Sequence, residues 1–162
     1  VIELLKQMRS QIPDIALRTT FIVGFPGETE KEFNSLVSFI KDYKFNWMGV
    51  FPYSREEDTP AYNYANQVSE PIKKLRVNKL MSIQQEITAE LNNNLINKML
   101  TVLVEGISEA NQELFYGRTQ YQAPEVDGIT YFTTTIQPQV GEFVNVKITH
   151  VDNYDLIGEM VP

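Results

Sequence analysis

Two strand-like segments flank a helical one in the first half of the chain, and this order strongly limits the folds open to it. Residues 16–23 and 47–51 are short, apolar and rich in β-branched or aromatic side chains, as buried strands are. Between them, Thr29 and Glu32 form a capping-box pattern, and apolar residues then repeat at helical spacing to about Tyr43. A strand–helix–strand order predicts a parallel sheet, so we expect this part of the chain to be α/β.

The second half follows a different pattern. A long helix is predicted over residues 71–98, starting with proline at its first position. Five short alternating segments then follow, separated by Gly, Pro and Asn turns: 101–107, 114–121, 129–135, 143–151 and 155–160. Such strands predict a small five-stranded antiparallel barrel. We therefore expect an α/β part at residues 1–70, a connecting helix at 71–99 and an all-β barrel at 100–162.

The composition excludes several kinds of site. The chain has no cysteine and a single histidine, His150, so it predicts no thiolate metal site, no disulfide and no Cys-His or Ser-His nucleophile. No residue of this chain is predicted to be catalytic. The sequence also lacks the roughly 20-residue apolar run of a membrane span and the apolar core of a signal peptide. We expect a soluble, cytoplasmic protein with no membrane partner.

The charge is divided unevenly along the chain. Residues 1–99 hold twelve basic and twelve acidic residues, whereas residues 100–162 hold two basic and nine acidic ones, so the net charge of −7 lies in the predicted barrel. The segment 117–128 between two strands is polar and acidic. Small barrels often bind oligonucleotides on aromatic side chains, but that mode also needs a cationic groove. The charge instead favours a basic protein partner, with nucleic acid a less favoured alternative.

Two loops that follow the predicted strands are candidate ligand-binding segments. In parallel α/β sheets, ligands collect where the strands end. Glycines let the backbone approach a ligand closely, and aromatic side chains can stack on a nucleobase. Structural alternatives remain for both loops. The first can equally be a tight turn that needs Gly and Pro, and for the second the residues alone slightly favour a plug that covers the barrel end. The candidate residues are Gly24, Phe25, Pro26, Gly27, Val50, Phe51 and Tyr53.

Taken together, these segments resemble the C-terminal part of the radical-SAM methylthiotransferases. The similarity lies in residues 18–29 and 50–54, which resemble the fifth and sixth strands of that family's barrel, and in residues 141–148 and 154–158, which resemble its terminal TRAM domain. The resemblance implies a segment of a partial (β/α) barrel followed by a small OB-like TRAM barrel. It covers essentially the whole chain.

The resemblance also implies cofactors and partners. Family members use S-adenosylmethionine and two 4Fe-4S clusters, whose cysteine ligands would lie outside this chain, so the chain alone is expected to be inactive. The two candidate loops would line the adenosine side of the S-adenosylmethionine site, chiefly through their backbone. Two strands without neighbours would expose edges that invite dimerisation.

Within the family, residues 123–128 resemble the branch that methylthiolates an aspartate of small-subunit ribosomal protein S-twelve. The implied role of the TRAM domain is to recognise this basic protein, with Arg118, Glu125 and Asp127 as candidate contacts. The alternative is the branch that modifies adenosine in tRNA, whose TRAM domain would bind RNA.

Overall fold

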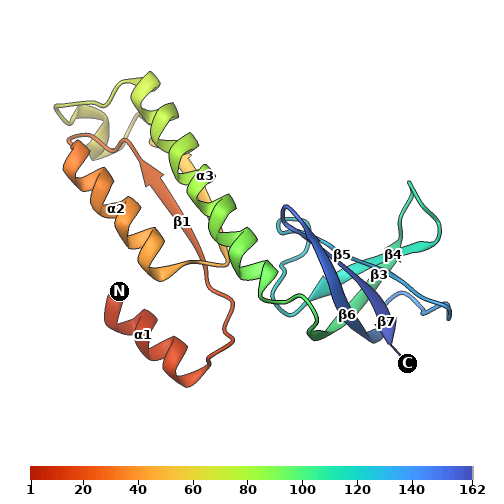
Figure 1. The fold of residues 1–162 in the computed structure, drawn as a ribbon. Coiled ribbons are helices and arrows are strands. Elements are labelled where there is room, and N and C mark those ends of the chain that lie inside the picture. The colour runs from red at the N-terminus through yellow and green to blue at the C-terminus, as the bar shows by residue number, and fades with distance from the viewer. Residues whose placement is uncertain (162) are drawn as a thin grey trace. The chain divides into compact units, whose positions relative to one another are not determined.

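The computed structural model describes residues 1–161, which form two compact units that divide between Ile87 and Thr88 (Figure 1). Each unit has its own secondary structure and its own buried residues, and each is described here by itself. None of the helices in the described part of the chain combines the length and the apolar character needed to cross a membrane.

The first unit contains a parallel pair of strands packed with helices. Its strands β1 (Arg18–Val23) and β2 (Trp47–Pro52) are joined by helix α2 (Glu30–Tyr43). They pair in parallel, from Arg18 opposite Trp47 to Val23 opposite Pro52, which confirms the predicted parallel sheet. The remaining elements are α1 (Ile2–Gln11), a short 3-10 helix (Pro60–Asn63) and most of α3 (Glu70–Asn93).

The sheet of the first unit has two strands in the described residues, so each strand has an outer edge with no strand partner there. A two-stranded sheet is compatible with a segment of a (β/α) barrel but does not establish one. Both the partial barrel and dimerisation through these edges therefore stay predictions.

Helix α2 begins as its sequence predicts. The Thr29 hydroxyl accepts a hydrogen bond from the Glu32 backbone N–H at 3.3 Å, and the Glu32 carboxylate accepts one from the Thr29 N–H at 2.7 Å. This capping box satisfies two N–H groups that a helix start would otherwise leave unpaired. The same hydrogen bonds, first from the Thr29 backbone and then from its side chain, lower the pKa of Glu32 below its ordinary value.

Helix α3 ends five residues earlier than predicted. Residues 92–94 are three consecutive asparagines, which have low helix propensity, and Asn97 has a left-handed backbone with φ of 67°. Leu95 continues the helical spacing in sequence, but it packs against the core of the barrel in the second unit. Its apolar character therefore reflects barrel packing and not a longer helix.

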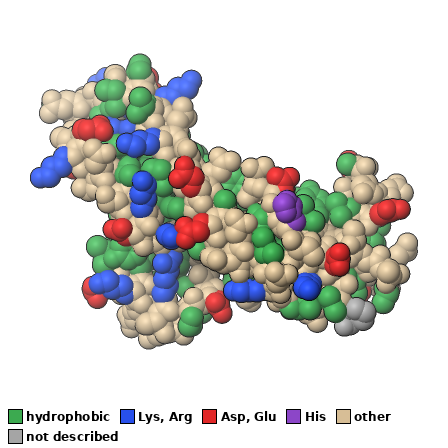
Figure 2. Space-filling model, in the orientation of Figure 1, with side chains coloured by type: hydrophobic (Ala, Val, Ile, Leu, Met, Phe, Trp, Pro, Cys, Tyr) green, Lys and Arg blue, Asp and Glu red, His purple; other side chains and the backbone are tan. Residues whose placement is uncertain are grey.

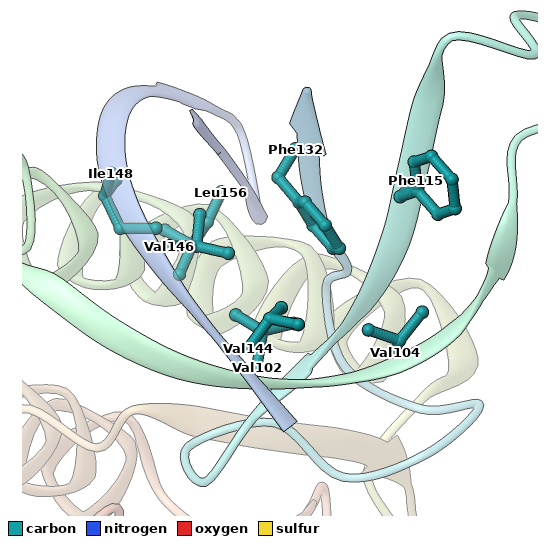
Figure 3. Close-up of a cluster of buried hydrophobic side chains, with 8 residues drawn as sticks. All are labelled: Val102, Val104, Phe115, Phe132, Val144, Val146, Ile148 and Leu156. Carbon is teal, nitrogen blue, oxygen red and sulfur yellow. The ribbon is translucent and has the colours of Figure 1, made fainter. Parts of the chain in front are cut away.

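The second unit is a closed barrel of five strands in the order β3, β4, β5, β7, β6. The strands are β3 (Met99–Ile107), β4 (Leu114–Thr119), β5 (Thr130–Thr133), β6 (Phe143–Asp152) and β7 (Asp155–Val161). Alternate residues of the strands point inward. Figure 3 shows the resulting core, formed by Val102, Val104, Phe115, Phe132, Val144, Val146, Ile148 and Leu156.

The prediction that this barrel is antiparallel throughout is wrong. Strands β5 and β7 pair in parallel, with Thr130 opposite Leu156 and Thr133 opposite Glu159, whereas the other four neighbouring pairs are antiparallel. The reason is geometric. In a closed ring with an odd number of strands, directions cannot alternate all the way round, so at least one neighbouring pair must be parallel.

Candidate functional site

The ends of β1 and β2 bring the two candidate loops together. Val23 and Pro52, the last residues of the two strands, are partners in the sheet. The Tyr53 backbone N–H donates to the Val23 carbonyl at 2.8 Å, and the Phe25 and Tyr53 rings meet edge to face with centroids 5.1 Å apart. The parallel pairing thus gathers Gly24, Phe25 and Tyr53 at one edge of the sheet.

Gly24 occupies a position that only glycine fits well. Its φ of +76° lies in the left-handed region, and a Cβ added there would lie 2.4 Å from Cγ of Lys73. Gly27 also has a left-handed φ, +89°, but open space surrounds it. Both residues therefore serve the turn conformation, and Gly24 in addition permits the close approach of helix α3.

The loop after β1 uses its glycine N–H groups internally. The Gly24 N–H donates to Glu28 Oε1 at 3.0 Å, and the Gly27 N–H donates to the Asn66 carbonyl at 2.9 Å. Pro26 has no N–H to offer. The groups that this loop can present to a ligand include carbonyl oxygens and the ring of Phe25, which is 43% exposed.

The candidate residues at the end of β2 and in the loop after it differ in exposure. Val50 is buried, with its side chain in the core of the unit, whereas Phe51 is 59% exposed. Tyr53 is half-buried, and its hydroxyl is buried without a hydrogen-bond partner in residues 1–161. A buried hydroxyl without a partner is unfavourable in a folded protein.

Two basic residues at this edge were missed by the sequence reasoning. Lys73 and Arg76 of α3 are only 3% and 4% exposed, and both contact the candidate loops. The helical spacing of apolar residues in α3 does point to these two positions. The buried residues Leu80, Ile83 and Ile87 of α3 follow a spacing of three and four, and extending that spacing toward the start of the helix reaches positions 76 and 73.

On the barrel, Arg118 lines a cavity of about 660 Å³ together with Met99, Tyr121, Gln122 and Phe143. Arg118 lies in β4 and forms an ion pair with Glu105 at 3.4 Å. Gln122 is buried, and its side-chain oxygen accepts from the Thr119 N–H at 2.9 Å and the Thr130 hydroxyl at 2.8 Å. The lining of this cavity is mixed polar and apolar, with Arg118 as its cation.

The two acidic candidates lie in the loop between β4 and β5, outside the residues that line this cavity. Glu125 is exposed, with a left-handed φ of 62°. Asp127 is half-buried, and its carboxylate accepts a hydrogen bond from the Ala123 N–H at 2.7 Å. Glu125 is thus free to face a partner, whereas Asp127 also shapes its own loop.

Most of the acidic residues of the barrel are exposed. Several carboxylates accept hydrogen bonds from backbone N–H groups, including Asp155 from Ile129 at 2.7 Å and Glu142 from Gln139 at 3.0 Å. Such bonds orient a carboxylate without neutralising it. In the face drawn in Figure 2, lysine and arginine side chains gather over the first unit, and few of them lie over the barrel.

No cluster of three or more His, Asp or Glu side chains suited to a metal ion occurs within residues 1–161, and the sequence contains no cysteine. The chain therefore presents no donor set that fits an iron–sulfur cluster. The edge formed by β1 and β2 offers other groups to a ligand: the exposed ring of Phe25, the ring of Tyr53 that packs against it, and the carbonyl oxygens of the loop after β1.

Comparison with known proteins gives a matching domain family and several relatives of this chain. Residues 96–161 match the TRAM domain family. The chain is 48% identical over 98% of its length to ribosomal protein uS12 methylthiotransferase RimO of Acetivibrio thermocellus. The chain is related to the C-terminal part of the RimO methylthiotransferases. The RimO proteins of Syntrophotalea carbinolica and Carboxydothermus hydrogenoformans are 51% and 47% identical over 98% and 99% of this chain.

The chain spans only about a third of the RimO relatives that it matches, 35% of the Acetivibrio and Syntrophotalea proteins and 36% of the Carboxydothermus protein. The resemblance to the methylthiotransferases is confirmed. The closed five-stranded barrel occupies the residues that match the TRAM family.

Proposed function

We propose that this chain is part of a radical-SAM methylthiotransferase that modifies an aspartate of ribosomal protein uS12. The observation that carries the proposal is the 48% identity to a RimO protein over 98% of the chain, covering both units. On this proposal, each unit contributes to binding, and neither performs the chemistry alone.

The edge of the first unit is proposed to bind the adenosine end of S-adenosylmethionine. Carbonyl oxygens of residues 24–27 would accept from the adenine amino group, and Phe25 and Tyr53 would contact the base through their rings. Support comes from the position of these residues at the ends of parallel strands, where α/β proteins bind ligands. Val50 and Phe51 would contribute through the backbone of β2.

S-adenosylmethionine and two 4Fe-4S clusters would supply the radical and the sulfur chemistry of the whole enzyme. Since this sequence has no cysteine, the cluster ligands would come from another part of the protein. The residues of this chain would bind and orient the nucleoside and exclude water from it. We therefore expect the 162-residue chain to be inactive by itself.

The TRAM barrel is proposed to bind uS12. Its excess of seven negative charges would attract a protein rich in lysine and arginine and would repel RNA phosphates. Glu125 is the best supported of the three candidate contacts, because it is exposed in the β4–β5 loop. Arg118 is paired with Glu105, and Asp127 accepts a hydrogen bond within the loop, so both would act mainly by shaping the surface.

Binding of the 162-residue chain to purified uS12 and to tRNA at several salt concentrations tests this proposal. We expect uS12 to bind and its affinity to fall as salt rises, because screening weakens charge attraction. Glu125→Lys should weaken this binding more than Glu109→Lys, a control in a different loop. Binding of tRNA with a steep salt dependence, together with no binding of uS12, would contradict the proposed role of the barrel.

A further inference from the structure

Lys73 and Arg76, which we call the α3 pair, are buried to a degree that is rare for basic residues. They are 3% and 4% exposed, whereas lysine and arginine are almost never fully buried unless they are paired. Removing a charge from water is costly without compensating contacts. The position of the α3 pair therefore indicates a specific role inside the first unit.

Lys73 contacts both candidate loops. Its ammonium donates to the Tyr53 carbonyl at 2.8 Å and to Glu70 Oε1 at 2.6 Å, and it lies 5.3 Å from the centroid of the Tyr53 ring. Its aliphatic stem fills the space beside Gly24, where an added Cβ would come within 2.4 Å. One side chain thus holds the loop after β2 through its ammonium and packs on the loop after β1 through its stem.

Arg76 holds the loop after β1 through its contacts with Glu28. Its guanidinium donates to Glu28 Oε1 at 2.5 Å and to the Glu28 carbonyl at 3.3 Å. The same Oε1 accepts the Gly24 N–H at 3.0 Å. Charge-assisted hydrogen bonds of this kind are stronger and more directional than neutral ones. Arg76, Glu28 and Gly24 therefore form a chain of contacts that fixes the backbone of Gly24.

We propose that the α3 pair are positioning residues that set the affinity for S-adenosylmethionine by fixing the two loops relative to each other. The inference rests on the proposed function, because it takes these loops as the nucleoside site. The α3 pair act through Gly24, Glu28 and Tyr53 and do not touch the ligand themselves. Their contacts would hold the carbonyl oxygens of the first loop and the ring of Tyr53 in the geometry that a bound nucleoside needs.

Equilibrium binding of S-adenosylmethionine to the full-length protein that carries this chain tests the inference, with thermal unfolding measured on the same samples. Lys73→Met keeps the stem beside Gly24 and removes the ammonium. We expect it to raise the Kd by about tenfold or more, because small displacements of a binding group have large effects. Lys74→Met, at the exposed neighbouring position, is the matched control and should leave the Kd unchanged.

Arg76→Gln should raise the Kd similarly, and Arg76→Lys, which keeps the charge but loses the fork of donors, should restore part of the affinity. Glu28→Gln keeps the shape of the Glu28 side chain and removes its charge. It serves as a milder variant if the Arg76 variants do not fold. We expect it to weaken binding as well.

Two outcomes would overturn the inference. The first leaves the proposed nucleoside site intact, and the second removes it as well. If Lys73→Met and Glu28→Gln lower the unfolding temperature but leave the Kd of the folded protein unchanged, the α3 pair has only a structural role and the proposed nucleoside site stands. If the unaltered protein does not bind S-adenosylmethionine at all, the proposed site fails together with the inference.

Discussion

At the scale of single residues, Gly24 carries two constraints at once. Its backbone is left-handed, and the stem of Lys73 fills the space where a side chain would extend. The sequence indicates the first constraint, since a glycine directly after a strand suggests a turn. It does not indicate the second, because Lys73 lies 49 positions away in the chain and its contact depends on the packing of α3.

Gly24→Ala and Gly27→Ala separate these two constraints. Both substitutions force alanine into a left-handed backbone, which costs about 1–2 kcal/mol. Only Gly24→Ala must also displace Lys73, because Gly27 has open space around it. Urea denaturation should therefore show a clearly larger loss of stability for Gly24→Ala. Equal losses would mean that the contact between Lys73 and Gly24 does not constrain the folded chain.

At the scale of elements, the capping box of α2 shows what local sequence can specify. The prediction from Thr29 and Glu32 is confirmed because all of its atoms lie within four residues. The end of α3 and the parallel pairing of β5 with β7 were predicted wrongly, because both depend on the closed barrel. Leu95 was read as helical, and its packing partners lie in distant strands. The helical spacing of α3 points to Lys73 and Arg76, but their contacts with Tyr53 and Glu28 join residues far apart in the chain.

The capping box also predicts a dependence of stability on pH. The pKa of Glu32 is lowered in the folded chain by hydrogen bonds from Thr29. A carboxyl with a lowered folded pKa stabilises the fold above its ordinary pKa of 4.5, and this contribution is lost as the pH falls through the folded pKa. The stability difference between the unaltered chain and Glu32→Gln should therefore be present at pH 7 and should shrink below pH 4.5.

Urea denaturation of the unaltered chain and of Glu32→Gln, at pH 7 and below pH 4.5, measures this stability difference. Thr29→Ala serves as a companion variant, because it removes the hydroxyl that caps the helix and should cost about 1 kcal/mol at pH 7. A difference for Glu32→Gln that stays constant from neutral to acidic pH would show that the charge of Glu32 does not contribute to capping.

At the scale of the whole molecule, the chain combines two compact units with different secondary structure. The change from helical to alternating pattern near residue 100 predicted the all-β character of the second unit, and the barrel confirms it. Whether the first unit belongs to a larger (β/α) barrel stays a prediction, because β1 and β2 pair only with each other within residues 1–161. The cytoplasmic location also stays a prediction.

The barrel should depend on its phenylalanine core. Phe132 is fully buried and stacks on Phe115 with ring centroids 5.9 Å apart. Phe132→Ala should destabilise the second unit by about 3–5 kcal/mol, the usual cost of emptying a buried aromatic site. Amide hydrogen exchange of the barrel strands measures the loss. Phe143→Ala is the matched control, because Phe143 is 69% exposed and its removal should leave the exchange of the core strands nearly unchanged.

The proposed function assigns this chain to an enzyme that acts on a ribosomal protein. Mass spectrometry of uS12 and of tRNA, after incubation with the full-length protein, S-adenosylmethionine, a reductant and a sulfur source, tests it most directly. We predict that uS12 gains the mass of one methylthio group on an aspartate and that tRNA is unchanged. A methylthiolated adenosine in tRNA with unmodified uS12 would contradict the account.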